Sequence, residues 1–222
     1  MKNILIVGAS SDAAKSLYQK YKKNVNFVRL SRSSDYSNVE GFDVLEPETY
    51  FKSDLKYDGL VYFPGTIRLR PFKQIKIEDF QTDFDINVLG LIKILKYYLP
   101  FFNLGCSLVF ISSVAASIGM PFHSSVSVSK SAILGLCKSL SAEFAPTYRV
   151  NCISPSLFKS KMSERFLRND AAVQNIKEKN PLNMIGESND IASLIYFLLS
   201  SDSKWITGQD FAIDGGMSVI KK

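Results

Sequence analysis

Near its start the chain reads Asn3-Ile4-Leu5-Ile6-Val7-Gly8-Ala9, an almost unbroken run of aliphatic and β-branched residues. A run of this kind is typical of a strand that is buried on both faces, as in a parallel sheet. Gly8 then opens a turn, and the polar residues 10–12 offer several caps for the helix that we expect over residues 13–21. The sequence therefore predicts a strand, a glycine turn and a helix, which is the repeating unit of α/β proteins.

Alternation of the two patterns continues along the chain. Further strands are expected at residues 26–30, at a short segment ending near Asp43-Val44, and at 59–63, 107–112, 149–154 and 211–214, with helices at 77–102, 125–144 and 190–200. Such alternation predicts a doubly wound, Rossmann-like parallel β-sheet flanked by helices, in one domain spanning residues 1–222. Ligands of these sheets bind beyond the carboxyl ends of the strands, so the residues that follow each strand are the candidates for chemistry.

Composition narrows the class of protein. Apolar residues make up 46% of the 222 and charged residues 22%, which matches an average folded chain and argues against disorder. No apolar run approaches the ~18 residues of a membrane span, and the first residues lack a signal-peptide pattern, so we expect a cytoplasmic protein with no membrane contact. Cys106, Cys137 and Cys152 fit no metal or disulfide spacing and are expected to be buried thiols, with no metal bound.

Motifs near the ends of the expected strands point to a known family. They lie at Val150–Pro155, Pro181–Glu187, Asp190–Ala192, Ile206–Gln209 and Asp214–Gly216. In order and spacing these motifs resemble the short-chain dehydrogenase/reductase family over nearly the whole chain, and the C-terminal ones resemble its 3-oxoacyl-[acyl-carrier-protein] reductase-like branch. The resemblance implies a dinucleotide-binding fold and the NAD(P)(H)-dependent reduction or oxidation of a carbonyl or alcohol in a small-molecule substrate.

The chain is short for that family between Arg32 and Asp43. Too few residues lie there for the usual crossover helix together with a full third strand. We therefore expect a shortened second crossover, in which a loop over residues 33–40 replaces the helix.

The resemblance assigns cofactor contacts to the strand ends. In the family the first turn reads Gly-x-x-x-Gly-x-Gly, and here Gly8 keeps the first glycine whereas Asp12 and Ala14 replace the other two. A carboxylate at Asp12 would repel a pyrophosphate, unless it turns away and caps the helix. The cofactor contacts that the resemblance implies are Gly8, Ser10, Ser11, Asp12, Arg32, Asp43, Val44, Gly65, Lys130, Pro155 and Ser160.

The end of the second expected strand bears on the choice of cofactor. The segment Leu30–Ser34 offers Arg32 and no carboxylate before Asp35. Arginine suits the extra phosphate of NADP, whereas an acidic residue would bond the ribose hydroxyls of NAD. The sequence favours NADP(H) over NAD(H), with a merely solvated Arg32 as the alternative.

The resemblance also implies a catalytic set of Asn, Ser, Tyr and Lys. Asn87, Ser113 and Lys130 match the asparagine, serine and lysine of that set. The tyrosine should lie four residues before the lysine, one helical turn away on the same face, and that residue is Val126. Valine has no proton to exchange, so a general acid–base that typically contributes about 10²–10⁴-fold to the rate is missing.

Two side chains are candidates to replace it. His123 lies three residues before Val126 and would share its helical face if the helix has begun by then; the alternative is a later helix start, which leaves His123 in a loop. Tyr62 lies in Tyr62-Phe63-Pro64-Gly65, where the family has Asn-Asn-Ala-Gly, and either points toward the cofactor or packs against its neighbours.

Two functions remain open. One is an oxidoreductase whose acid is His123 or a water held by Asn87 and Lys130, and the other is a non-catalytic relative that keeps the fold as a binding or structural subunit.

The distribution of basic residues bears on which ligands the protein binds. Basic residues that would overhang the site are Arg68, Arg70, Lys73, Lys159, Lys161, Arg165 and Arg168. They either recognise an anionic substrate or form a solvated face. The net charge of +6 does not indicate nucleic-acid binding, because no arginine-rich tract with interleaved aromatics is present.

Family members pair through the helices expected here at 77–102 and 125–144. The first is apolar around too much of its circumference for a one-sided helix, so we expect a homodimer or homotetramer.

Overall fold

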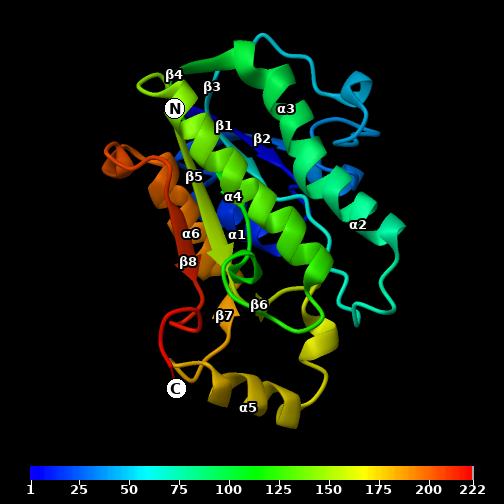
Figure 1. The fold of residues 1–222 in the computed structure, drawn as a ribbon. Coiled ribbons are helices and arrows are strands. Elements are labelled where there is room, and N and C mark those ends of the chain that lie inside the picture. Colours follow the sequence, from blue (N-terminus) through cyan, green and yellow to red (C-terminus); the bar gives the residue numbers. More distant parts are fainter. Residues whose placement is uncertain (222) are drawn as a thin grey trace.

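Six parallel strands form the central sheet of the protein, seen in a computed structural model that describes residues 1–221 (Figure 1). The strands are β1 (Lys2–Val7), β2 (Val25–Leu30), β3 (Tyr57–Tyr62), β4 (Phe102–Ile111), β5 (Arg149–Pro155) and β8 (Asp210–Ile213). Their order is β2-β1-β3-β4-β5-β8, and each neighbouring pair is parallel. The predicted Rossmann-like parallel sheet flanked by helices is confirmed.

Helices cover both faces of the sheet, and each face has its own core. One face carries α1 (Asp12–Tyr21) and α6 (Ser188–Leu199), and the other carries α2 (Ile77–Phe84), α3 (Gly90–Tyr98) and α4 (Ser124–Phe144) (Figure 1). Alternate residues of a strand point to opposite faces, so β1 places Ile4 and Ile6 in the first core and Leu5 and Val7 in the second. Burial on both sides explains why this strand is an unbroken apolar run.

The segment after β2 differs from the prediction. No strand forms among the described residues between β2 and β3, so the short strand expected to end at Asp43-Val44 is wrong. Instead Asn38 lies along the edge of β2: its N–H donates to the Arg29 carbonyl O over 2.7 Å, and its Oδ1 accepts from the Arg29 N–H over 2.6 Å. These bonds satisfy backbone groups that another strand would otherwise cover. A loop over residues 33–40, with one 3₁₀ turn at Ser34–Tyr36, replaces the crossover helix as predicted.

The helix predicted at 77–102 is interrupted and ends earlier. A π-helical stretch at Asp85–Leu89 joins α2 to α3, and a 3₁₀ turn at Leu99–Phe101 ends the helix before β4 begins. Such π-helical stretches are frequent at functional sites. The fully buried Tyr62, at the end of β3, donates its hydroxyl to the Ile86 carbonyl O of this stretch over 2.6 Å. Tyr62 therefore packs against the helix, and the alternative in which it faces a cofactor is wrong.

Replacing Tyr62 with phenylalanine is expected to lower the free energy of unfolding by about 1–2 kcal/mol, because the partly buried Ile86 carbonyl group would lose its donor. Guanidinium denaturation of the variant and the wild type measures the difference. Tyr196→Phe is a matched control, because the half-buried Tyr196 is stacked on Tyr21, and loss of its hydroxyl is expected to cost no more than about 0.5 kcal/mol. Equal stability of Tyr62→Phe and Tyr196→Phe would contradict a stabilising role for this hydrogen bond.

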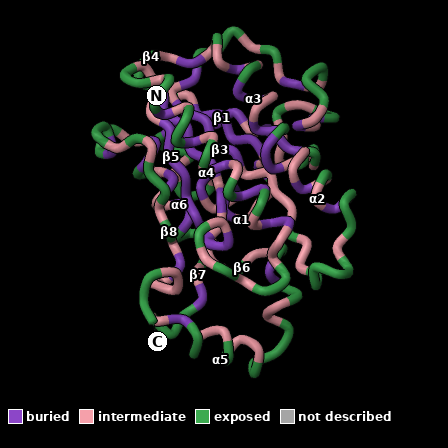
Figure 2. Tube along the Cα trace, in the orientation of Figure 1, coloured by how far each residue is buried: buried purple, intermediate pink, exposed green. Residues whose placement is uncertain are grey.

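A smaller layer lies beyond the carboxyl ends of the strands. β6 (Phe158–Lys159) pairs with β7 (Gly186–Glu187), and α5 (Asp170–Lys179) lies beyond them (Figure 1). Between β6 and α5 the chain also forms one 3₁₀ turn, at Glu164–Phe166. Figure 2 shows that the main strands are buried, whereas α5 is half-buried or exposed.

The three cysteines are buried, as predicted, on β4, α4 and β5. The Cys137 thiol lies against the Val150 carbonyl O, and the Cys152 thiol lies against the Ile133 carbonyl O. Within residues 1–221, no cluster of three or more His, Cys, Asp or Glu side chains is placed to hold a metal ion. None of the helices in that same range combines the length and the apolarity needed to span a bilayer.

Candidate functional site

The carboxyl ends of β1, β3, β4 and β5 meet at one edge of the sheet. Across this edge the strands are followed by Gly8, by Phe63–Gly65, by Ser112 and Ser113, and by Ser156. α1 begins beside Gly8, so its unpaired N–H groups and the positive end of its dipole lie at the same edge. The edge therefore gathers backbone donors and small polar side chains in one place.

Gly8 opens the turn between β1 and α1 with a φ of +82°. A Cβ at this residue would lie 2.9 Å from Pro64 Cδ and 3.1 Å from Phe63 Cβ. Both the dihedral angle and the close approach of the next strand end therefore require glycine here. Ser10, which follows two residues later, is exposed at the start of α1.

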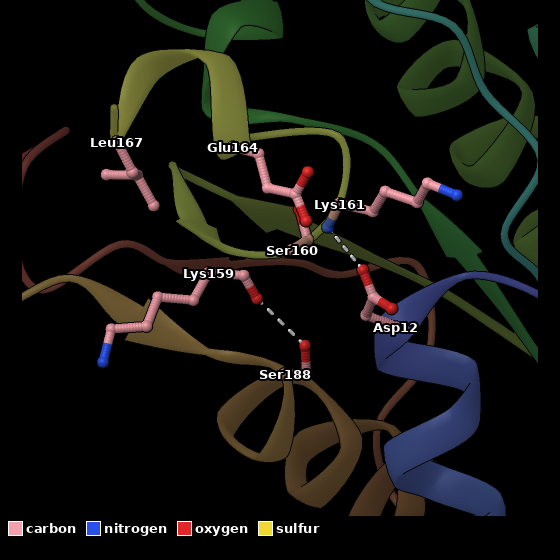
Figure 3. Close-up of a pocket in the computed structure, with 7 residues that line it drawn as sticks. All are labelled: Asp12, Lys159, Ser160, Lys161, Glu164, Leu167 and Ser188. Carbon is pink, nitrogen blue, oxygen red and sulfur yellow. Dashed lines mark hydrogen bonds between the residues drawn. The ribbon is translucent and has the colours of Figure 1, made fainter. Parts of the chain in front are cut away.

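Asp12 is the first residue of α1 but does not cap it. The cap is Ser11, whose Oγ accepts from the Ala14 N–H over 3.2 Å. Asp12 instead points across to the segment after β6, where its Oδ2 accepts from the Lys161 N–H over 2.6 Å (Figure 3). Its Oδ1 accepts from Lys15 Nζ over 3.3 Å. The alternative of a capping Asp12 is therefore wrong, and the carboxylate links α1 to that segment.

Asp12 lies in the wall of an open cavity of about 750 Å³. The cavity is lined by Asp12, Lys159, Ser160, Lys161, Glu164, Leu167 and Ser188 (Figure 3). Ser160 is held by its N–H, which donates to Ser163 Oγ over 2.9 Å. The side chains of Lys159 and Lys161 point away from each other, and Lys159 forms an ion pair with Glu187 over 2.9 Å. The two cations are therefore not gathered on one point of the cavity.

The residues expected around the adenosine end are spread over the β2 edge. Arg32 is exposed directly after β2. Asp43 is engaged in its own turn, because its Oδ1 accepts from the Leu45 N–H over 2.8 Å. Val44 is buried, and its Cγ2 would lie 3.0 Å from a Cβ on Gly90 of α3. Arg32 is therefore the side chain of this group that is free to reach a ligand.

Gly65, Asn87 and Lys130 meet at one point. A Cβ on Gly65 would lie 2.9 Å from Asn87 Oδ1 and 3.0 Å from Lys130 Nζ. Lys130 is buried, and its Nζ donates to the Ile111 carbonyl O over 2.9 Å. Asn87 Oδ1 is buried and has no hydrogen-bond partner in the part of the chain that the structure describes. A bound water or ligand beside Gly65 would complete the hydrogen bonding of both groups.

The Lys130 ammonium titrates close to physiological pH. Burial lowers its pKa to about 8, and the neighbouring Cys152 and Asp83 partly oppose the shift. The group is therefore charged at neutral pH and loses its proton on mild alkalinisation. Perturbed groups of this kind cluster at functional sites.

Ser113 and Pro155 flank this group on β4 and β5. Ser113 caps a 3₁₀ turn at Val114–Ala116, and its Oγ accepts from the Ala115 N–H over 3.2 Å. It lies two residues after Ile111, whose carbonyl group accepts from Lys130. Pro155 is buried at the end of β5. Ser113 is half-buried at the same edge.

His123 does not share the helical face of Val126. α4 begins at Ser124, so His123 precedes the first turn, as the loop alternative expected. Its Nδ1 lies 2.7 Å from the Pro121 carbonyl O, which can only accept, so the ring donates within its own loop. Val126 is 2% exposed in the first turn of α4.

Asp83, a fully buried carboxylate one helical turn before Asn87, belongs to none of the sequence motifs named above. Its two oxygens accept from Thr66 Oγ1 and Ser125 Oγ. Asp79, Asp83 and Asn87 are spaced by four residues and so share one face of a helix. That polar spacing is the signal in the sequence that could have shown the cluster.

Three of the basic residues expected over the site are engaged within the protein, and one of them is Lys159, in its ion pair with Glu187. Arg68 pairs with Asp79 over 2.5 Å and with the Asp83 carboxylate over 3.4 Å. Arg165 Nη2 donates to the Ile67 carbonyl O over 3.2 Å. Arg70, Lys73 and Arg168 are exposed. The basic overhang is therefore smaller than the sequence predicts.

Known proteins share this fold along its whole length. The solved structure of 4-hydroxyisoleucine dehydrogenase complexed with NADH is 25% identical and superposes with a TM-score of 0.88 over 100% of both chains. The solved structure of ElxO with NADP bound is also 25% identical, with a TM-score of 0.83 over 98% of this chain and 99% of that one. The relatives therefore include proteins solved with either dinucleotide.

Proteins that are similar in sequence point to the same family as the similar structures. Short-chain dehydrogenase/reductase SDRA of Arabidopsis thaliana is 31% identical over 170 residues, which are 77% of this chain and 66% of that relative. The chain spans between 49% and 66% of the curated relatives it matches first, less than two thirds of their length. Residues 11–218 match the family model described as enoyl-(acyl carrier protein) reductase. The chain belongs to the short-chain dehydrogenase/reductase family of oxidoreductases.

Proposed function

We propose that the protein is an NAD(P)(H)-dependent oxidoreductase that reduces or oxidises a small-molecule carbonyl or alcohol, with an altered proton-transfer site. The group formed by Gly65, Asn87 and Lys130 carries the proposal. It joins a buried cation, a buried acceptor that has no hydrogen-bond partner within residues 1–221, and a glycine that leaves the space between them open. A dinucleotide cofactor supplies the hydride when it is bound.

The residues at the sheet edge fit a dinucleotide. A side chain at Gly65 would fill the space beside Lys130, and a side chain at Gly8 would clash with the next strand end. The N–H groups at the start of α1 would hold the pyrophosphate. Lys130 would hold the hydroxyls of the nicotinamide ribose, for which its ammonium has donors to spare beyond the bond to Ile111.

Asp12 is compatible with a pyrophosphate nearby. Its carboxylate already accepts from the Lys161 N–H and from the Lys15 ammonium, which offset part of its charge. Asp12, which replaces the family's second glycine, is therefore compatible with the binding of a pyrophosphate.

The proton-transfer site is the altered part. Val126 stands four residues before Lys130, where the family has its tyrosine, and a buried valine cannot exchange a proton. Asn87 and Lys130 would hold a water that exchanges the proton, while Ser113 would bond the substrate oxygen. His123 is a weaker candidate, because its ring is engaged in the loop before α4.

A second function is a non-catalytic relative that binds a dinucleotide or serves as a structural subunit. The apolar, 2% exposed Val126 favours it, because this residue presents no acid to a substrate. In that case the wild type would bind cofactor and show no turnover. A measurable wild-type rate of carbonyl reduction would exclude this second function.

Binding of NADPH and NADH, measured by thermal shift and titration, tests the proposal. We expect NADPH to bind more tightly, because Arg32 is the exposed side chain after β2 and suits a 2′-phosphate. Arg32→Ala should weaken NADPH binding about tenfold, the loss of one charge-assisted hydrogen bond, and should leave NADH binding unchanged. Arg70→Ala, another exposed arginine, is the control. A protein that binds neither nucleotide is no oxidoreductase of this kind.

Assembly as a homodimer or homotetramer is part of the proposal. α3 buries Leu91, Ile94, Leu95 and Tyr98 within the chain, which accounts for much of its apolar pattern. Leu89 and Val128, beside α3 and on α4, are 37% and 55% exposed. These two side chains support pairing of the two helices with a second copy.

A further inference from the structure

A carboxylate with no role in the proposed chemistry lies beside the Gly65–Asn87–Lys130 group. Asp83 is 0% exposed near the end of α2, and its two oxygens accept from the hydroxyls of Thr66 and Ser125. Arg68 Nε lies 3.4 Å from its Oδ1. A buried carboxylate is costly unless it is paired and hydrogen-bonded, and here both conditions hold. The partners come from the loop after β3 and from α4, so Asp83 joins three elements around the site.

The same network fixes which way the Asn87 amide points. Asn87 Nδ2 donates to the Asp83 carbonyl O over 2.7 Å, and to Thr66 Oγ1 and Ser129 Oγ over 3.3 Å each. The Thr66 hydroxyl gives its hydrogen to the Asp83 carboxylate, and the Ser129 hydroxyl gives its own to a backbone carbonyl. Both hydroxyl oxygens can therefore only accept from Asn87. The amide must turn its nitrogen toward them, which leaves its oxygen toward Lys130.

Asp83 also acts on Lys130 through its charge. The groups that face the Lys130 ammonium are the Cys152 thiol on β5 and the Asp83 carboxylate on α2, and both favour its charged form. Arg68 pairs with the Asp83 carboxylate and is shared with Asp79. Removal of the Asp83 charge would therefore lower the pKa of Lys130 further, because burial, which is already the largest influence, would be opposed less.

We propose that Asp83 is a positioning residue for this site, which holds the Asn87 amide so that its oxygen faces the point beside Gly65 where the Lys130 ammonium also lies. Its carboxylate acts through the Thr66 hydroxyl, which Asn87 also contacts, and through its charge. The inference rests on the proposed function, since the orientation of Asn87 has a use only where a cofactor and a substrate bind. Because Val126 offers no phenol, Asn87 and Lys130 are the polar groups on which proton transfer depends.

Three substitutions separate this role from a merely structural one. Asp83→Asn removes the charge and keeps the size of the side chain. Thr66→Val removes the link to Asn87 and keeps the Asp83 charge. Asp79→Asn is the matched control, because it makes the same change one turn earlier on α2, in a carboxylate that bonds Arg68 and the Lys76 N–H instead. Thermal melts show whether each variant is folded.

The first readout is the NMR signal of the Asn87 side-chain NH₂ group, which is identified by its loss in Asn87→Ala and needs no cofactor. In the wild type this signal should exchange slowly with water. Asp83→Asn and Thr66→Val should each speed the exchange about tenfold, the effect of losing one hydrogen bond, and Asp79→Asn should not. If Asp83→Asn fails to fold, Thr66→Val alone makes the same test.

The second readout is NADPH affinity from about pH 6 to about pH 9.5, a range that spans the titration of Lys130. Asp83→Asn should move the loss of affinity to lower pH, whereas Thr66→Val and Asp79→Asn should not. An unchanged Asn87 signal in both Asp83→Asn and Thr66→Val overturns the positioning role, even if NADPH binds tightly. A wild type that does not bind NADPH counts against the proposed function only, because the NH₂ signal still decides the role of Asp83.

Discussion

NADPH binding is expected to weaken about 10- to 100-fold when Lys130 is replaced with methionine, because a hydrogen bond from a charged group contributes about 1.5–3 kcal/mol. Methionine keeps the apolar stem of the side chain and removes the ammonium that lies beside Gly65. Fluorescence titration with NADPH at neutral pH measures the loss. Lys138→Met, an exposed lysine further along α4, is the control and should bind NADPH as the wild type does. Equal affinity of Lys130→Met and the wild type would contradict a cofactor contact at Lys130.

The pH dependence of the wild type follows from the same ammonium. Its pKa is about 8, so affinity should fall as the pH rises through that value, and Lys130→Met should lack the fall. Stability moves in the opposite direction. The pKa is 10.5 in the unfolded chain, so between about pH 8 and 10.5 the unfolded chain binds more protons than the folded one, and the contribution of Lys130 to the free energy of unfolding rises with pH. Lys130→Met should therefore lose cofactor binding at neutral pH without a matching loss of stability.

Val126→Tyr is expected to raise the rate of carbonyl reduction by about 10²–10⁴-fold, the usual contribution of a general acid. A tyrosine there would stand one turn before Lys130, whose ammonium lowers the pKa of a nearby phenol. The rate is measured as NADPH consumption with a panel of ketones, aldehydes and diketones. Because Val126 is 2% exposed, the larger ring should cost about 1–3 kcal/mol of stability, so rates are compared per folded protein.

Val126→Phe is the matched control for that experiment. It adds the same ring without the hydroxyl, so it should suffer the same loss of stability and show no gain in rate. A similar gain in Val126→Phe would mean that space, and not proton transfer, limits the reaction. The wild-type rate separates the two proposed functions, since a low but measurable rate indicates an altered acid and no rate indicates a non-catalytic relative. His123→Ala should leave that low rate unchanged if Asn87 and Lys130 hold the proton-exchanging water.

Much of the fold can be predicted from local patterns. The run at residues 3–9 forms β1 and its turn, because an apolar strand with no polar face must be covered on both sides. The shortened crossover is also predictable, since chain length alone limits what residues 32–43 can build. The strand expected at Asp43-Val44 fails because the loop satisfies the β2 edge with Asn38, a pairing that no local pattern encodes.

The candidate site can be predicted only in part. Gly65, Asn87 and Lys130 match a motif, and the structure brings them to one point. Asp83 matches no motif, because its function depends on partners that are far away in the sequence. The orientation of Asp12 is likewise decided by Lys161, which lies 149 residues further along the chain.

The periodicity of apolar residues and the residues at strand ends can be read from short stretches of sequence. Burial of apolar area follows from these patterns and depends little on the exact packing of side chains. The layered α/β fold, the position of the ligand-binding edge and the valine at residue 126 are therefore already set by the order of the amino acids. The pairing of buried polar groups is different, because a carboxylate such as Asp83 can bond only what packing places within about 3 Å of it. Which hydroxyls Asp83 accepts from, where Asn87 points and how far the Lys130 pKa falls are consequences of that packing alone.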